Sequence, residues 1–128
     1  MYHMTVEGRF SAAHCIREHP GACRRLHGHN YRVVVHLTGS ELDALGMLVD
    51  YGDVKHALTI VLQPYDHGYL NELPDFETVN PTSEGLARTL FRQLRETLLT
   101  TDDLRRRVHV REVVVFEAEH QGVGYGED

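Results

Sequence analysis

The stretch NYRVVVHLT, residues 30–38, decides the fold, because its side chains alternate strictly between an apolar and a mixed face. The apolar face carries Tyr31, Val33, Val35 and Leu37. This period of two is typical of a β-strand with one buried side. Gly39 and Ser40 interrupt the pattern, so we expect the strand to end there.

Two further strands are expected on either side of this one. Residues 5–13 form a weaker pattern that places His14 at the end of a strand. Residues 108–117 form a strong pattern, and since both of its faces are largely apolar, we expect it to be covered on both sides. Residues 123–125 can add a short fourth strand.

The middle of the chain predicts two helices. Apolar residues from Val54 to Leu62 follow helical spacing, with Asp53 as a suitable N-cap and Pro64 as the stop. Thr82 can cap a second helix whose apolar stripe runs from Leu86 to Leu98. The segment 100–107 is expected to be polar, with its arginines in a solvated turn. The order β-β-α-α-β-β predicts an α+β fold, with an antiparallel four-stranded sheet and two helices on one face.

Composition sets the broad class. The 128 residues suit a single domain over 1–128, and a net charge of −6 argues against nucleic acid as a partner. Two cysteines are too few for a secreted disulfide framework, so a cytoplasmic location is expected. Neither a targeting segment nor an apolar run of membrane-spanning length is apparent. The ten histidines are the unusual count.

Three of these histidines suggest a metal site. His27 and His29 lie two residues apart at the start of the central strand, so their side chains project to the same side. His14 comes alongside if the first two strands pair. Three imidazoles with an open fourth position are typical of catalytic zinc. A closed structural site made of Cys15, Cys23 and the His27/His29 pair is the alternative from a different class of protein, a non-catalytic zinc-binding module.

Three other positions carry reactive groups. Cys23 lies in a polar loop four residues before His27, where a metal and imidazoles would activate its thiol; burial as a small apolar residue is the alternative. Asp66 and His67 can form a carboxylate–imidazole pair that relays a proton, or they can occupy an ordinary turn. Glu117 follows an apolar strand, so it is either paired with a bidentate donor or simply solvated.

These residues, taken together, resemble a known family. Phe10-x-Ala12-Ala13-His14, Cys23-x₃-His27-Gly28-His29-x-Tyr31, Val49-Asp50, Asp66-His67-x₂-Leu70-Asn71, Asn80-Pro81-Thr82-Ser83-Glu84 and Glu117 occur in the order of the 6-pyruvoyl-tetrahydropterin synthase superfamily. The resemblance covers nearly the whole chain. It implies a tunnelling fold (T-fold) and a homohexamer built as a dimer of trimers, with active sites between subunits.

The resemblance also implies roles for the residues. His14, His27 and His29 would bind Zn²⁺, Cys23 would be the catalytic thiol, Asp66 and His67 would relay protons, and Glu117 would anchor the pterin.

The three-residue gap between Cys23 and His27 is similar to the 6-carboxy-tetrahydropterin synthases of queuosine (7-deazaguanine) biosynthesis. These lyases convert 7,8-dihydroneopterin triphosphate to 6-carboxy-5,6,7,8-tetrahydropterin, acetaldehyde and triphosphate. The alternative within the family is 6-pyruvoyl-tetrahydropterin synthase activity. Ala118 departs from the family pattern, which has Thr after the anchoring glutamate, so one hydroxyl contact is missing.

Overall fold

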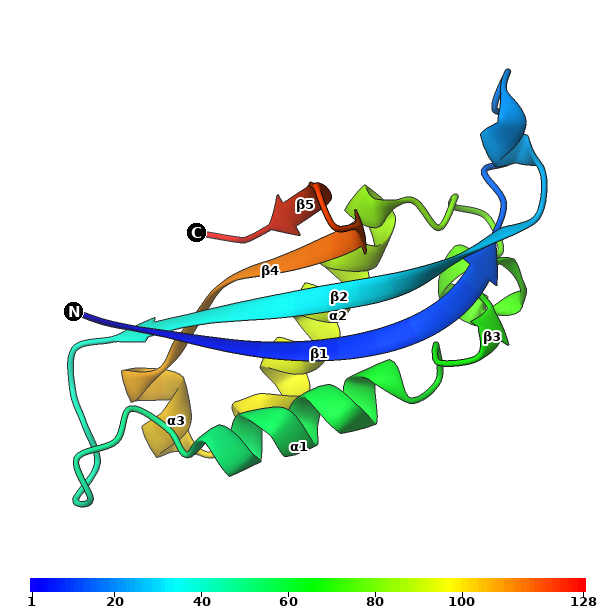
Figure 1. Ribbon diagram of the computed structural model, residues 1–128. Coiled ribbons are helices and arrows are strands. Elements are labelled where there is room, and N and C mark those ends of the chain that lie inside the picture. The colour runs from blue at the N-terminus through cyan, green and yellow to red at the C-terminus, as the bar shows by residue number, and fades with distance from the viewer.

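The computed structural model describes residues 1–128 as a curved β-sheet with its helices on one face (Figure 1). The sheet has five strands in the order β3-β1-β2-β4-β5. In chain order the strands are β1 Tyr2–His14, β2 His27–Gly39, β3 Gly68–Tyr69, β4 His109–Ala118 and β5 Gln121–Tyr125. The helices are α1 Tyr51–Leu62, α2 Ser83–Leu98 and α3 Asp102–Arg107, with short 3₁₀ turns at Ala22–Arg24, Leu70–Glu72 and Pro74–Phe76.

The expected α+β class is confirmed, with a difference in the sheet. The four expected strands pair antiparallel, but β3 adds a fifth that runs parallel to β1. The chain leaves α1 along the edge of β1, where the His67 N–H donates to the Ser11 carbonyl at 2.6 Å, and residues 68–69 then pair with 12–13. Two residues are too few to show a period of two, so the sequence pattern could not predict this strand.

The prediction that β4 is covered on both sides is wrong, and a β-bulge is the reason. Leu37 pairs with Val110, whereas its neighbour His36 pairs with Glu112, so Arg111 is an extra residue in β4. The bulge changes the face of β4 that points at the core, because one inserted residue reverses the alternation. The valines before it at 108 and 110 and those after it at 113 and 115 are therefore all buried on the same side.

Each helix begins at a side-chain cap. The N-cap of α1 is Asp50, whose carboxylate accepts from the Gly52 N–H at 2.7 Å, and not the expected Asp53, which lies in the first turn. Thr82 caps α2 as predicted. The segment 100–107 forms α3 and not a solvated turn, because Thr101 caps it, aspartates occupy its first turn and arginines its last turn.

The core lies between the sheet and the helices, in one cluster of 27 buried residues. Phe10 of β1 stacks on Tyr31 of β2 with ring centroids 4.6 Å apart. Continuing along the same face toward the ends of these strands, the apolar side chains give way to histidines. This end of the sheet is the region of interest.

Candidate metal centre and substrate pocket

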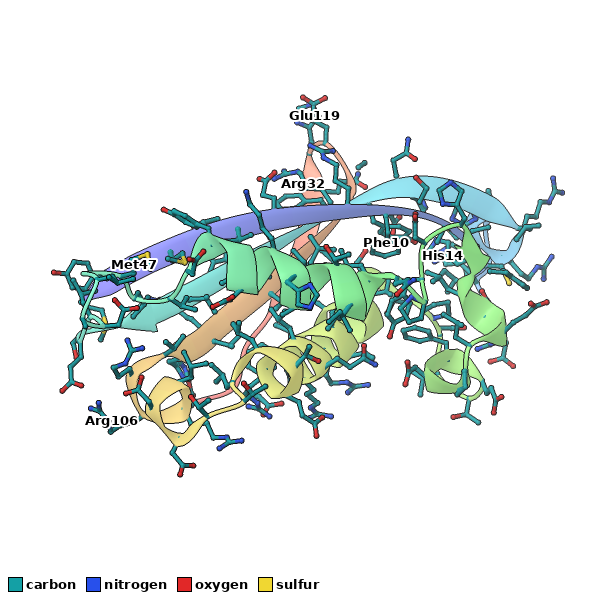
Figure 2. All side chains as sticks on the ribbon, turned by 90° about the horizontal axis from the view of Figure 1, so that it is seen from below. Phe10, His14, Arg32, Met47, Arg106 and Glu119 are labelled. Atoms are coloured by element: carbon teal, nitrogen blue, oxygen red, sulfur yellow. The ribbon has the colours of Figure 1, made fainter.

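Three histidines gather on the helix-facing side of the sheet, at the end of β1 and the beginning of β2. His14 is paired with His27 across the two strands, and His29 is paired with Ala12, so the three side chains share the face of Phe10 and Tyr31. Their ring centroids are 4.6 to 5.0 Å apart. Figure 2 shows His14 and Phe10 on the same strand, with His14 toward the end of the sheet that lies away from Met47. The expected pairing of the first two strands therefore brings His14 to the other two.

Backbone carbonyls fix the tautomers of two of these rings. The Nδ1 of His14 is 2.8 Å from the Pro81 carbonyl oxygen, and the Nδ1 of His27 is 2.7 Å from the Arg25 carbonyl oxygen. A carbonyl only accepts hydrogen bonds, so each Nδ1 holds a proton and each neutral Nε2 presents a lone pair. The two Nε2 atoms lie 3.0 Å apart, so their lone pairs repel each other unless a cation binds to both.

His29 completes the set of nitrogen donors. Its Nε2 is buried and has no hydrogen-bond partner, although Glu117 Oε1 lies 3.4 Å away. The ligand atoms of the three histidines all lie within 4.8 Å of one another. An unpartnered buried nitrogen is costly unless a ligand satisfies it, and three neutral imidazoles are a typical set for a first-row divalent metal. These residues therefore fit a metal ion.

Burial keeps two of the imidazoles neutral. Desolvation lowers the pKa of His14 and is the largest influence on it, against an upward push from the Pro81 carbonyl. Desolvation likewise lowers the pKa of His29, opposed by the Glu117 carboxylate. Neutral imidazole is the form that binds a metal, so these environments favour ligation at neutral pH.

Glu117 lies near the end of β4, beside the first turn of α2. The Ser83 hydroxyl donates to its Oε2 at 3.0 Å, and its side chain is 29% exposed. The positive end of the α2 dipole also favours a carboxylate there. Glu117 is therefore a held and partly desolvated carboxylate, and not a freely solvated one. Ser83 is a contact that the sequence did not single out, although it lies within the motif at 80–84.

Cys23 and Glu117 line the same cavity, of about 450 Å³. Cys23 lies exposed in the turn Ala22–Arg24, and its carbonyl accepts from the Ile16 N–H at 2.7 Å. Cys15 is elsewhere, half-buried with its Sγ 3.4 Å from the Tyr69 hydroxyl. The metal-binding group thus contains three histidines and neither cysteine, which speaks against the closed structural site.

Asp66 and His67 form the expected pair at the edge of the sheet. Asp66 Oδ2 lies 3.0 Å from His67 Nδ1, while its Oδ1 accepts from the Ser11 N–H at 2.9 Å. The Ser11 N–H lowers the pKa of the Asp66 carboxyl most, and His67 lowers it further. His67 has a φ of 59°, in the left-handed region that costs a non-glycine residue free energy.

Within one chain, the proposed reactive groups fall into two separate hollows. His67 and His29 line a hollow of about 380 Å³ together with Ser11 and Gly28. No residue of that hollow lines the cavity that contains Cys23 and Glu117. The structure therefore brings the histidine triad and Glu117 together, but it leaves Asp66 and His67 apart from Cys23.

The chain is similar in sequence and in fold to known pterin synthases. The chain is 36% identical over 107 residues to 6-carboxy-5,6,7,8-tetrahydropterin synthase of Bacillus subtilis, covering 80% of this chain and 71% of that one. It is 38% identical over 101 residues to the protein of the same name from Synechocystis, covering 75% and 77%. The structure of Caenorhabditis elegans 6-pyruvoyl tetrahydropterin synthase superposes with a TM-score of 0.84 at 26% identity, covering 99% and 96%.

No helix is both long and apolar enough to cross a membrane. The sequence profile of the 6-pyruvoyl tetrahydropterin synthase family matches residues 3–128. The match includes all three histidines of the triad and every strand except the first residue of β1. The resemblance noted in the sequence and the α+β T-fold that it implied are confirmed. The chain belongs to the 6-pyruvoyl tetrahydropterin synthase family.

Proposed function

We propose that this protein is a zinc-dependent 6-carboxy-5,6,7,8-tetrahydropterin synthase of queuosine biosynthesis. It would convert 7,8-dihydroneopterin triphosphate and water to 6-carboxytetrahydropterin, acetaldehyde and triphosphate. The observation that carries the proposal is the cavity lined by Cys23 and Glu117, next to three imidazoles whose ligand atoms lie within 4.8 Å of one another. The names of the Bacillus and Synechocystis relatives support the choice of product.

Zinc would be held by His14, His27 and His29, and when bound it supplies a Lewis acid that acidifies the hydroxyls of the substrate side chain. The carbonyls of Pro81 and Arg25 hold two of these rings in the ligating tautomer. Iron would suit the same nitrogen donors, since imidazole binds both metals well.

Glu117 would anchor the pterin ring. The amino-pyrimidinone edge of a pterin presents two parallel N–H donors, which match the two oxygens of a carboxylate. Ser83 already holds Oε2, so the carboxylate is oriented before the ligand arrives. A fixed ring places the reacting carbons of the side chain at one position in the cavity, which lowers the entropic part of the barrier.

Cys23 would accept and return protons at the side-chain carbons as a thiolate, from the wall of the same cavity. Asp66 orients the His67 imidazole through the 3.0 Å contact, so that His67 can transfer a proton to the opposite face of the substrate. Since these two lie outside the Cys23 cavity of their own chain, they would serve the site of a neighbouring subunit. A homohexamer with sites between subunits meets this requirement.

The alternative is 6-pyruvoyl-tetrahydropterin synthase activity, which eliminates triphosphate without breaking a carbon–carbon bond. The likeness to the Caenorhabditis elegans protein of that name favours it. The two activities leave products of different mass, and only the first releases acetaldehyde.

Incubation of the purified protein with 7,8-dihydroneopterin triphosphate, followed by mass spectrometry, tests the proposal. We expect 6-carboxytetrahydropterin and acetaldehyde from the wild type. A Cys23→Ala variant should keep its metal and lose turnover, since the thiol is not among the ligands. The pyruvoyl product would select the alternative, and full turnover by the variant would remove Cys23 from the mechanism.

A further inference from the structure

The cavity that contains Cys23 and Glu117 has an uneven charge distribution. Two of its eleven lining residues are carboxylates, Glu84 and Glu117, and neither lysine nor arginine is among the eleven. The lining residues that can carry a positive charge are His19 and His120. Among the side chains that this chain contributes to the cavity, these two histidines are therefore the ones suited to a polyanionic part of a ligand, because the carboxylates repel it.

His19 is held in one orientation by the loop between β1 and β2. The Gly21 N–H donates to its Nδ1 at 2.9 Å, so the ring proton of the neutral imidazole is on Nε2. The ring packs on Gly21 so closely that a Cβ there would lie 3.2 Å from Cε1. Glu18, with a φ of 66°, makes the turn that precedes the ring. No hydrogen bond within the chain uses the Nε2 of His19, which leaves this N–H free to donate to a ligand.

His120 lines the same cavity from the turn between β4 and β5. Figure 2 shows its neighbour Glu119 projecting beyond the sheet. The His120 Nε2 makes only a 4.0 Å contact with Glu119, and both side chains are 88% exposed. Such an exposed pair contributes little, so the His120 ring can turn toward a bound anion.

We infer that His19 and His120 together bind the triphosphate of the substrate, in the same cavity in which Glu117 would anchor the pterin ring. This inference rests on the proposed function and assigns the phosphate contacts within that site. The ring and the triphosphate are at opposite ends of the substrate. The lining of the cavity offers the Glu117 carboxylate to the N–H donors of the ring and two imidazole donors to the triphosphate. The histidines would also stabilise the charge on the triphosphate as it leaves.

Equilibrium binding of separate probes distinguishes contacts to the triphosphate from contacts to the pterin ring. The probes are 7,8-dihydroneopterin triphosphate, 7,8-dihydroneopterin without phosphates, and inorganic triphosphate. They are titrated by calorimetry into chains that are wild type at positions 19 and 120 or carry His19→Ala, His120→Ala or His19→Gln, all in a Cys23→Ala background, so that the substrate binds without turnover. His56→Ala is the matched control, since His56 is exposed on α1 and away from the cavity. Circular dichroism checks that each variant is folded.

We expect each alanine variant to bind both triphosphates about 10-fold more weakly, the size of one lost charge-assisted hydrogen bond. Binding of dihydroneopterin should stay within about twofold of wild type. His19→Gln should recover part of the loss, because its amide N–H reaches near the position of Nε2. Unchanged triphosphate binding, or an equal loss for all three probes, would overturn the inference.

The outcome remains interpretable if the proposed function is wrong. In that case the wild type binds neither pterin, while inorganic triphosphate still reports on the two histidines alone. A wild type that binds pterins but shows no histidine-dependent binding of inorganic triphosphate would leave the proposed function standing and reject the histidine site.

Discussion

At the scale of single residues, the site depends on hydrogen bonds that orient the functional side chains. The carbonyls of Pro81 and Arg25 set the tautomers of His14 and His27, and the Ser83 hydroxyl holds Glu117. Carbonyl acceptors on the ring nitrogen remote from a metal are a common feature of histidine ligands. The donor set is therefore arranged before any ion binds.

Removal of one ligand should release the metal. We expect His27→Ala to weaken metal affinity by at least about 10-fold, since the loss of even a supporting contact to a ligand has that effect. His27 is half-buried, so its loss should leave the fold intact. Elemental analysis after dialysis measures the metal content, with His56→Ala as the control. Equal metal in the two variants would mean that the ion binds elsewhere.

The Asp66 carboxyl should titrate below the ordinary range for aspartate. The Ser11 N–H is the larger cause and His67 the smaller, so His67→Ala should raise the pKa of Asp66 only partway. A carboxyl with a lowered folded-state pKa stabilises the fold above its unfolded-state pKa, and this contribution disappears as the pH falls through the folded-state value. NMR titration of the side-chain carboxyl carbon measures the pKa. A full return to the ordinary value in His67→Ala would contradict the dominant role of Ser11.

At the scale of the elements, the strand pair β1–β2 and the beginning of α2 position the site. The antiparallel register places His14 opposite His27. Pro81 lies just before α2 and Ser83 is its first residue, so the beginning of this helix supplies the contacts to His14 and Glu117. The far end of the same strand pair must therefore also be held, because a slip of one residue would turn the histidines to the other face. Gly39 is the residue at that end of β2, and it packs directly against the Arg107 carbonyl and the Leu48 side chain.

Gly39→Ala should destabilise the protein, because its Cβ would lie against the Arg107 backbone carbonyl, which cannot move aside. We expect a loss of about 1–3 kcal/mol in the free energy of unfolding, the usual cost of overpacking. Gly28→Ala is the matched control in the same strand, since its Cβ would lie an ordinary 3.6 Å from the Ala12 carbonyl oxygen. Urea unfolding followed by circular dichroism measures both. Similar changes in the two variants would show that the clash at Gly39 does not decide the stability, since Gly→Ala by itself lowers the entropy of the unfolded chain and favours the fold.

At the scale of the whole molecule, one chain does not assemble all the proposed catalytic groups. Cys23 lines one cavity, whereas His67 lines another together with His29 of the triad. A second copy of the chain can bring its own Asp66 and His67 to the cavity of the first. The proposed hexamer is therefore tied to activity and not only to stability.

Mixing two inactive variants should restore turnover. If Cys23 and His67 of one active site come from different subunits, a hexamer reassembled from equal amounts of Cys23→Ala and His67→Ala chains contains some intact sites. Random assembly predicts about a quarter of the wild-type activity. Product formation after joint unfolding and refolding measures it, and each variant refolded alone is the control. Activity no greater than that of the separate variants would place both residues in the same subunit.

The sequence by itself determined the types of the main elements and two of the side chains that form the histidine triad. Alternating side chains over 30–38 predicted the central strand, and helical spacing over 54–62 predicted α1, because both patterns are local. The spacing of His27 and His29 predicted that their side chains share a face, since residues two apart in a strand always do.

Only the tertiary structure decided what depends on residues far apart in the chain. The bulge at Arg111 follows from pairing with β2, and it overturned the prediction that β4 is covered on both sides. Likewise, β3 exists because β1 offers a free edge, and Ser83 meets Glu117 because α2 packs beside β4. Register and packing are set by the free energy of the whole assembly of strands and helices. A local pattern therefore predicts the type of each element, whereas the contacts between elements determine the geometry of the site.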